Sequence, residues 1–298
     1  MKDVPFALLA EGPFDPSSIT FRHTDQTIVH TPELDELIEG RWQKVSGGDP
    51  NFPNTPKVLV KRVSSKGDGL EIVTGMTDFR ERVGTQRQEV AERFGMQSVA
   101  VTLGITGVIE TADNALILAS RKTPHRTKGG GLHVIGGMAD ISDIVNDTID
   151  ICAISVRETS EETGIPRPRL EIVSCLGVMQ STESYAIDIL LASRTDMSEK
   201  EIRSLQGDGE VDLFFIENSP TTLRHTLLSY LKTASRPSIA ALYLYGLQKF
   251  GQEWRTIVEE RFSIRNQLYK QFTPELAERA RARLARRLTF SAQSRINI

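Results

Sequence analysis

Apolar residues change their spacing along the chain, and the changes divide it into three parts. Residues 1–95 mix short β-like runs with polar turns and one helical pattern. Residues 96–252 carry longer apolar runs, and residues 253–298 have the spacing of helices. We therefore predict an N-terminal α+β subdomain, a main domain and a helical C-terminal extension with these boundaries.

The helix of the first part is predicted over 32–43. Thr31 precedes it and can cap it, and Pro32 suits the first turn. Glu33 and Asp35 place negative charge at the positive end of the helix dipole.

The main domain alternates strand-like and helix-like segments. The expected strands are 99–109, 115–119, 170–178, 185–192 and 211–216, and the expected helices are 147–163 and 239–250. The first two strands form a hairpin across a short polar turn. The alternation predicts an α/β (α+β) fold in which helices cover a mixed sheet.

The C-terminal extension includes a helical pattern over 274–288 that is rich in arginine. Those arginines either form a solvated face, with the leucines of the same helix turned inward, or a surface for a partner or a phosphate group. The sequence leaves both readings open.

Composition and charge exclude several classes of protein. The 298 residues include 36 basic and 39 acidic residues, so the net charge of −3 provides no field to hold a nucleic acid or an anionic membrane. The apolar run 6–10 is too brief for a signal peptide, and no run is long enough to span a membrane. Two cysteines, Cys152 and Cys175, suggest neither a disulfide framework nor a zinc site, so we expect a cytoplasmic protein.

The chemistry that stands out is a group of three glutamates within five residues. Glu158, Glu161 and Glu162 are spaced by three and four positions, so a helix projects them from one face. Such carboxylates repel one another unless a hard cation such as Mg²⁺ or Mn²⁺ lies among them. Arg157 can pair with one of them and fix its rotamer, and Gly164 can end the helix in a left-handed conformation.

An ordinary acidic surface helix is the alternative, and the neighbouring sequence argues against it. We expect the opposite face of this helix to pack on a core through four apolar residues, Ile149, Ala153, Ile154 and Val156. A glycine pair, Gly136 and Gly137, lies upstream after a short strand, with a basic loop before it.

Residues 157–165 resemble the second half of the Nudix box, in which Arg-Glu is followed by an apolar residue, any residue, Glu-Glu, any residue, glycine and an apolar residue. Only Thr159 is less apolar than the pattern expects. The first half departs from it, because Asp143 stands where the family has a glutamate, six positions after Gly137. Arg157 then follows Gly137 by 20 positions rather than 14, which indicates a six-residue insertion.

The resemblance implies a Nudix fold and a hydrolase that binds Mg²⁺, or Mn²⁺, through Glu158, Glu161 and Glu162. It also implies that Arg157 orients the acidic cluster. In such an enzyme a water molecule activated by the metal attacks phosphorus. The insertion puts the loop geometry in doubt more than the metal ligands.

A general base often lies outside the box in this family, and three acids are candidates for that role or for a further metal ligand. Asp188 interrupts an apolar strand, a costly place for a carboxylate unless it faces a polar cavity. Glu210 and Asp212 flank the start of the next strand. A solvent-facing position is the alternative for each.

Four residues in or before the glycine pair are candidates to contact the phosphates of a substrate. They are Arg121 at the end of a strand, Lys128 in a glycine-rich loop, and Gly136 with Gly137. Backbone rich in glycine beside cations can hold a diphosphate, although a flexible loop explains the same pattern.

The N-terminal part resembles one branch of the Nudix family, the UDP-glucose and UDP-galactose diphosphatases. The resemblance rests on Trp42, the loop 49–52, the segment 75–79 and the pair Gly84-Thr85, in that order. It implies hydrolysis of a UDP-sugar to UMP and a sugar 1-phosphate. Thr77 and Asp78 within this segment also fit a helix-capping pair.

Two alternatives stay open. One keeps the enzyme class and changes the small-molecule substrate to ADP-ribose or a dinucleotide. The other is a nucleotide-sensing module with a Nudix fold that binds a nucleotide and does not hydrolyse it. The sequence leaves the oligomeric state open between monomer and homodimer.

Overall fold

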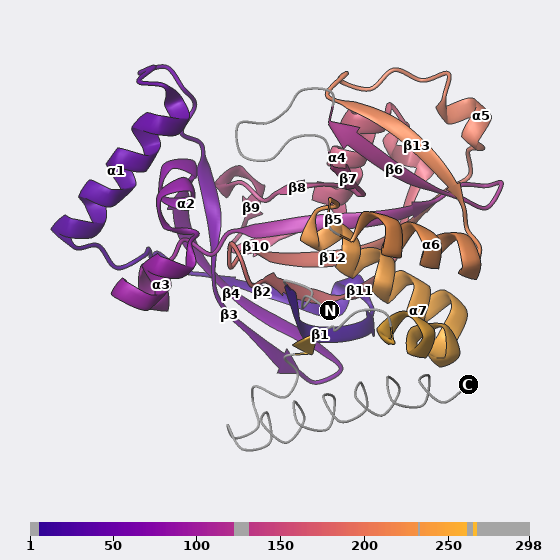
Figure 1. Cartoon of the computed structure of the whole chain (residues 1–298), viewed down its shortest axis with the longest axis horizontal. Coiled ribbons are helices and arrows are strands. Elements are labelled where there is room, and N and C mark those ends of the chain that lie inside the picture. The colour runs from indigo at the N-terminus through magenta and orange to yellow at the C-terminus, as the bar shows by residue number, and fades with distance from the viewer. Residues whose placement is uncertain (1–5, 122–130, 232, 261–264, 267–298) are drawn as a thin grey trace, which may run out of the picture.

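The computed structural model describes residues 6–121, 131–231, 233–260 and 265–266 (Figure 1). Its strands are β1 (Phe6–Phe14), β2 (Ile19–His23), β3 (Pro56–Lys66), β4 (Gly69–Asp78), β5 (Leu103–Glu110), β6 (Ala115–Arg121), β7 (Leu132–His133), β8 (Ile135–Met138), β9 (Ile144–Val145), β10 (Thr148–Ile149), β11 (Leu170–Ser181), β12 (Ile187–Thr195), β13 (Val211–Glu217) and β14 (Arg265–Asn266). Its helices are α1 (Pro32–Ser46), α2 (Phe79–Thr85), α3 (Gln88–Phe94), α4 (Ile151–Thr163), α5 (Glu199–Ile202), α6 (Pro220–Tyr230) and α7 (Arg236–Glu259).

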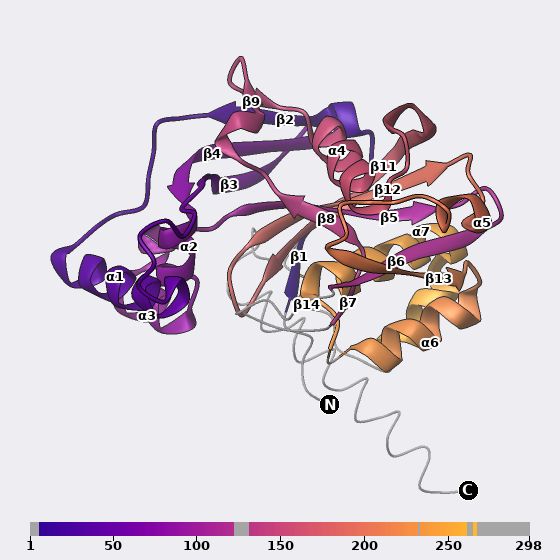
Figure 2. The same ribbon diagram turned by 90° about the horizontal axis from the view of Figure 1, so that it is seen from above.

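The main sheet is mixed and has the strand order β13-β6-β5-β12-β11-β1-β14. Strands β5 and β12 pair in parallel, whereas β11 pairs antiparallel with β12 and with β1. Helix α4 packs on one face and α7 on the other, as the view from above shows (Figure 2). Ile151 and Ile154 of α4 join one apolar cluster, and Leu242 of α7 joins another. The expected mixed sheet between helices is confirmed.

Strands β5 and β6 separate soon after the turn that joins them. They pair only at Ile109↔Ile117 and Glu110↔Leu116. Beyond that point β7 pairs with β6 and β8 pairs with β5, so the segment 132–138 fills the space between the two strands. This arrangement brings Gly136 and Gly137 into the sheet beneath α4.

The N-terminal part has its own three-stranded sheet, with β4 between β2 and β3. Helix α1 begins after Thr31, whose side chain accepts a hydrogen bond from the Leu34 N–H at 3.2 Å, as predicted. It runs three residues further than predicted and ends at Gly47, which has a φ of 68°. Strand β1 belongs instead to the main sheet, where it pairs with β11. The domain boundaries at 95 and 252 stay a prediction.

The motif residues of the N-terminal part hold α1 against α2. The Trp42 ring lies 5.3 Å from that of Phe52 and 6.1 Å from that of Phe79, both edge-on. Asp78 caps α2 by accepting from the Glu81 N–H at 2.7 Å, and the Thr77 hydroxyl donates to the Glu81 carboxylate at 2.6 Å. Thr77 and Asp78 therefore act as the capping pair that the sequence suggested.

Several expectations need correction around α4. The helix begins at Ile151 rather than at 147, because Asn146 and Asp147 adopt positive φ values of 52° and 60° in the β9–β10 hairpin. Ile154 is buried as expected, but Ala153 is exposed and Val156 is only half-buried. Ile149 is buried from β10 rather than from the helix.

The C-terminal half of the described chain is more helical than predicted. Helix α6 was not predicted, and α7 extends beyond the expected 239–250 through a kink at Gly251. None of the helices in the described ranges is long and apolar enough to cross a membrane. The arginine-rich pattern at 274–288 lies outside the described residues.

Candidate active site

The acidic helix has well-defined ends. Asp150 precedes it and accepts a hydrogen bond from the Ala153 N–H at 2.9 Å. Gly164 ends it with a φ of 76° and donates its N–H to the Ser160 carbonyl, as the sequence predicted. Thr159, the less apolar position of the motif, is buried, and its carbonyl accepts from the Thr163 hydroxyl at 2.6 Å. The methyl-bearing side chain of Thr159 therefore occupies a core position.

Arg157 lies at the centre of the acidic cluster. Its Nη1 is 2.8 Å from Oε1 of Glu158 and 3.7 Å from Oε2 of Glu161. Its Nη2 is 3.3 Å from Oδ1 of Asp143. One guanidinium therefore contacts three carboxylates and can set their positions relative to one another.

Glu158 lies directly over Gly137. A Cβ atom at position 137 would be 2.4 Å from the carboxyl carbon of Glu158, so a side chain there would displace this carboxylate. Burial raises the pKa of Glu158, the charge of Arg157 opposes that shift, and Glu161 and Asp143 add to it. The position of this carboxylate thus depends on strand β8 beneath it.

Glu162 is the most buried of the three glutamates, with 8% of its surface exposed. Its Oε2 is buried and has no hydrogen-bond partner within the described part of the chain. Burial raises its pKa to about 8; Arg121 opposes this, whereas Glu158, Asp208 and Glu210 add to it. An unpaired carboxylate oxygen beside like charges is the environment that a bound cation would stabilise.

The loop before β13 packs on the C-terminal end of α4 and adds two acids to the cluster. The Asp208 N–H donates to the Glu161 carbonyl at 2.8 Å. A Cβ at Gly207 would be 2.2 Å from the Glu162 carbonyl oxygen. Glu210 Oε2 is 3.7 Å from Nη1 of Arg121, so Glu210 lies beside the predicted phosphate contact.

The segment between the glycine pair and α4 keeps Asp143 close to Arg157. The β9–β10 hairpin, residues 144–149, projects between the loop and α4, and Asp143 stays within reach of Arg157. The backbone N–H of Asp140 donates to Oδ2 of Asp143 at 2.9 Å and fixes that turn. Asp143 therefore contacts Arg157 from a turn that lies six positions after Gly137.

Asp188 does not join this cluster. Its neighbours Ile187 and Ile189 pack in the same apolar cluster as Ile154 of α4, so Asp188 points to the opposite face of the sheet. Oδ1 accepts a hydrogen bond from the Thr106 hydroxyl at 3.2 Å. Burial raises its pKa to about 6, against the Thr106 hydrogen bond and the charge of Arg82.

The other predicted site residues lie in different places, and some of them are away from the acidic cluster. Gly136 lies beside Gly137 and leaves no room for a side chain, since a Cβ there would be 2.4 Å from the Ile105 carbonyl oxygen. Asp212 is exposed on β13. Lys128 lies outside the described residues.

The donor atoms of the cluster can be compared with those that a divalent metal ion prefers. As placed, no three His, Cys, Asp or Glu side chains in the described ranges are grouped closely enough to hold an ion. The donor chemistry nevertheless fits a hard dication, because three carboxylates share one helix face and Glu162 Oε2 is buried without a partner.

Sequence reasoning missed two residues beside the cluster, Asp208 and His133. Asp208 has no local signal, since backbone contacts between distant segments bring it to α4. His133 had a signal, because residues 133, 135 and 137 alternate onto one face of the sheet once the strand is placed.

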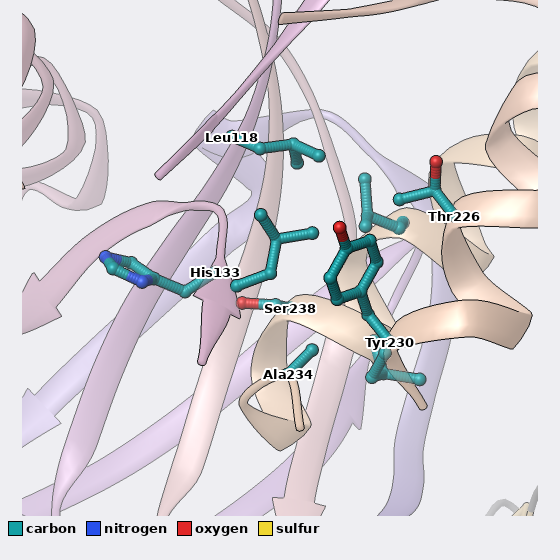
Figure 3. Close-up of a pocket in the computed structure, with 9 residues that line it drawn as sticks. Leu118, His133, Thr226, Tyr230, Ala234 and Ser238 are labelled. Carbon is teal, nitrogen blue, oxygen red and sulfur yellow. The ribbon is translucent and has the colours of Figure 1, made fainter. Parts of the chain in front are cut away.

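A small apolar hollow with no room for a water molecule lies between the main sheet and helices α6 and α7 (Figure 3). Leu118, Thr226, Tyr230 and Leu242 are among the residues that line it. It is on the face of the sheet opposite α4 and is separate from the acidic cluster.

Comparisons with known proteins complete the description. No protein-family profile matches the sequence, and no curated protein matches it. Solved structures that resemble the fold include a Nudix hydrolase from Nitrosomonas europaea, with 12% identity, 50% of this chain and 90% of that chain covered, and a TM-score of 0.37. The MutT protein from Methanosarcina mazei Go1 has 14% identity, coverages of 50% and 95%, and a TM-score of 0.36.

A Caenorhabditis elegans Ap4A hydrolase shares 14% identity, with coverages of 49% and 96% and a TM-score of 0.35. These structural neighbours are Nudix hydrolases. Their similarity to this chain is one of fold.

Proposed function

We propose that this protein is a Nudix-type hydrolase that uses a divalent metal ion, Mg²⁺ or Mn²⁺, to cleave the diphosphate of a nucleoside diphosphate linked to another group. Glu158, Glu161 and Glu162 would hold the metal. The observation that carries the proposal is Glu162, whose buried, unpartnered Oε2 lies among like charges on the same helix face as the other two.

Each residue of the cluster has a role in the proposed reaction. A bound dication supplies electrophilic stabilisation of a phosphoryl oxygen and lowers the pKa of water. Arg157 holds Glu158 and Glu161 in position through its ion pairs. The charge of Arg121 acts on Glu162, and Arg121 forms an ion pair with Glu210. Arg121 would bind a phosphate oxygen when Glu210 moves away.

Gly136 and Gly137 would contribute to the site because they have no side chains. Because neither bears a side chain, Glu158 can lie against the backbone of β8, and a diphosphate can approach there. Lys128 remains a proposed phosphate contact from the sequence alone. Asp188 is on the wrong face to contact the cluster, so Glu210 is the better placed of the predicted accessory acids.

We propose a UDP-sugar as the substrate, with UMP and a sugar 1-phosphate as products. Support comes from the order of motif residues in the N-terminal part, which resembles that of the UDP-sugar diphosphatases. Trp42, Phe79, Asp78 and Gly84 hold α1 on α2. The residues of this resemblance therefore build a structural unit.

A substrate panel tests this proposal. Purified protein is incubated with Mg²⁺ or Mn²⁺ and UDP-glucose, UDP-galactose, ADP-ribose or a dinucleotide, and the products are separated by chromatography. UMP with hexose 1-phosphate supports the full proposal. AMP with ribose 5-phosphate from ADP-ribose would keep the reaction and overturn the substrate. No product from any compound would favour a nucleotide-sensing module.

A further inference from the structure

His133 is a half-buried histidine that the proposed reaction has not yet used. It ends β7, and its Nε2 is buried without a hydrogen-bond partner in the chain as described. Its ring points away from Thr226 and Tyr230, on the other side of its strand (Figure 3). A buried ring nitrogen that faces no protein donor or acceptor calls for an explanation.

The strand alternation places the ring on the face of α4. Leu132 and Val134 pack in the apolar cluster under α7, so His133 and Ile135 point the other way. Two residues further, Gly137 faces Glu158 on the same side. His133 thus shares its face of the sheet with the acidic cluster.

Arg121 links His133 to the cluster from the neighbouring strand. His133 pairs with Ala119 of β6, and Arg121 is two residues beyond Ala119, so both side chains lie on one face. The charge of Arg121 acts on Glu162 and also on His133. Arg121 is thus the charged group that acts on the ring, and it also lies 3.7 Å from Glu210.

The hydrogen bonding of the ring fixes its tautomer. Nδ1 is 3.3 Å from the Gly131 carbonyl oxygen, which can only accept. Nδ1 therefore carries the hydrogen, and Nε2 of the neutral ring presents a lone pair. Burial lowers the pKa of His133, the Gly131 hydrogen bond opposes that shift, and Arg121 adds to it, so the ring is neutral at pH 7.

We propose that His133 is a catalytic general base, whose Nε2 takes a proton from the water that attacks phosphorus. The inference rests on the proposed hydrolase function. The water oxygen forms a bond to one phosphorus, the bond from that phosphorus to the bridging oxygen breaks, and the bridging oxygen leaves with the second phosphate. The proton passes from water to Nε2 and is then released to solvent, which restores the neutral ring.

The test uses His133→Asn in the full chain. Asparagine keeps a side-chain N–H that can donate to the Gly131 carbonyl and removes Nε2. The control is His225→Asn on α6, an exposed histidine whose Nε2 contacts only Ser229 at 3.4 Å among the described residues. Turnover of the best substrate of the panel is measured from pH 5 to 9, together with KM and Mn²⁺ affinity.

We expect His133→Asn to lower kcat by about 10² to 10⁴-fold, with KM and Mn²⁺ affinity within twofold of wild type. The acid limb of the kcat profile should disappear in this variant and persist in His225→Asn. A variant with wild-type kcat and an intact acid limb would overturn the base assignment and leave the hydrolase proposal standing. A wild-type protein that cleaves nothing would count against both.

A second measurement does not depend on turnover. Long-range ¹H–¹⁵N spectra of protein labelled at histidine report which ring nitrogen is protonated. We expect His133 to carry its proton on Nδ1 at pH 7. A proton on Nε2 would remove the acceptor and contradict the proposal whether or not the protein is active.

Discussion

Gly137 shows at the scale of one residue how the main sheet positions the site. The Glu158 carboxylate occupies the space where a side chain at 137 would begin. Arg157 holds the same carboxylate from the other side at 2.8 Å. A methyl group at position 137 should therefore move Glu158 without changing its charge.

We predict that Gly137→Ala lowers turnover about 10² fold, because displacement of a catalytic group by about 1 Å has that order of effect. The measurement is kcat together with Mn²⁺ affinity. Gly40→Ala is the matched control, since Gly40 is exposed on α1 with nothing within 4 Å of its Cβ position. Equal turnover in Gly137→Ala and Gly40→Ala would show that Glu158 does not need its observed position.

Asp188 gives a prediction about stability rather than turnover. Its pKa is about 6 in the folded protein and 3.8 in the reference state, so the folded state holds more protons between these values. The free energy of unfolding contributed by Asp188 is therefore highest below pH 4 and falls as pH rises through 6. A rise in the Asp188 pKa from 3.8 to about 6 corresponds to a decrease of roughly 3 kcal/mol in the free energy of unfolding across this pH range.

The check is urea unfolding of wild type and Asp188→Asn at pH 4, 5, 6 and 7. Asparagine stays neutral, so the free energy of unfolding of wild type relative to the variant should decrease from pH 4 to 6 and then level off. A difference that stays constant over this range would mean that Asp188 does not titrate as its burial implies.

Helices α1 and α2 illustrate the scale of the element. Gly84 of α2 lies against Ile38 of α1, where a Cβ would be 2.8 Å from the Ile38 Cα. Since backbone cannot give way as a flexible side chain does, the two helices would have to move apart. The Trp42 ring contacts to Phe52 and Phe79 would loosen with them.

We predict that Gly84→Ala destabilises the protein by about 1 to 3 kcal/mol through overpacking. Gly40→Ala, on the open side of α1, should instead stabilise it by about 0.5 to 1 kcal/mol. Urea denaturation measures both, and hydrogen exchange shows whether protection is lost first in α1. A neutral Gly84→Ala would mean that α1 and α2 are not held as closely as the structure shows.

The sequence predicted the ends of helices well where a single residue caps or ends its own helix. Thr31 as the cap of α1 and Gly164 as the end of α4 were both readable, since each acts on its own helix. The β9–β10 hairpin was not, because Asn146 and Asp147 give no strand pattern and their positive φ values depend on the turn they form. Helix α6 was missed because its apolar face is short and mixed with threonine and serine.

The site as a whole combines segments that are far apart in sequence. Strands β6 to β8 provide Arg121, Gly137 and His133, helix α4 provides the glutamates, and the loop before β13 provides Asp208 and Glu210. The sequence motif identified the residues of α4 and the glycines, and Arg121 and Glu210 were candidates from their places beside strands, whereas Asp208 and His133 were not identified. The separation of β5 from β6 and the choice of sheet face, which excludes Asp188, depend on pairing over long distances.

The most direct test of the central claim is a comparison of Glu162→Gln with Glu171→Gln, an exposed glutamate paired with Arg194. Mn²⁺ binding is followed by calorimetry, turnover on the substrate panel by product analysis, and folding by thermal unfolding. We predict that Glu162→Gln folds but loses most Mn²⁺ affinity and turnover by orders of magnitude, because one anionic ligand is gone. Glu171→Gln should match wild type. Wild-type metal binding and turnover in Glu162→Gln would contradict the assignment of the α4 acidic face as the hydrolytic centre.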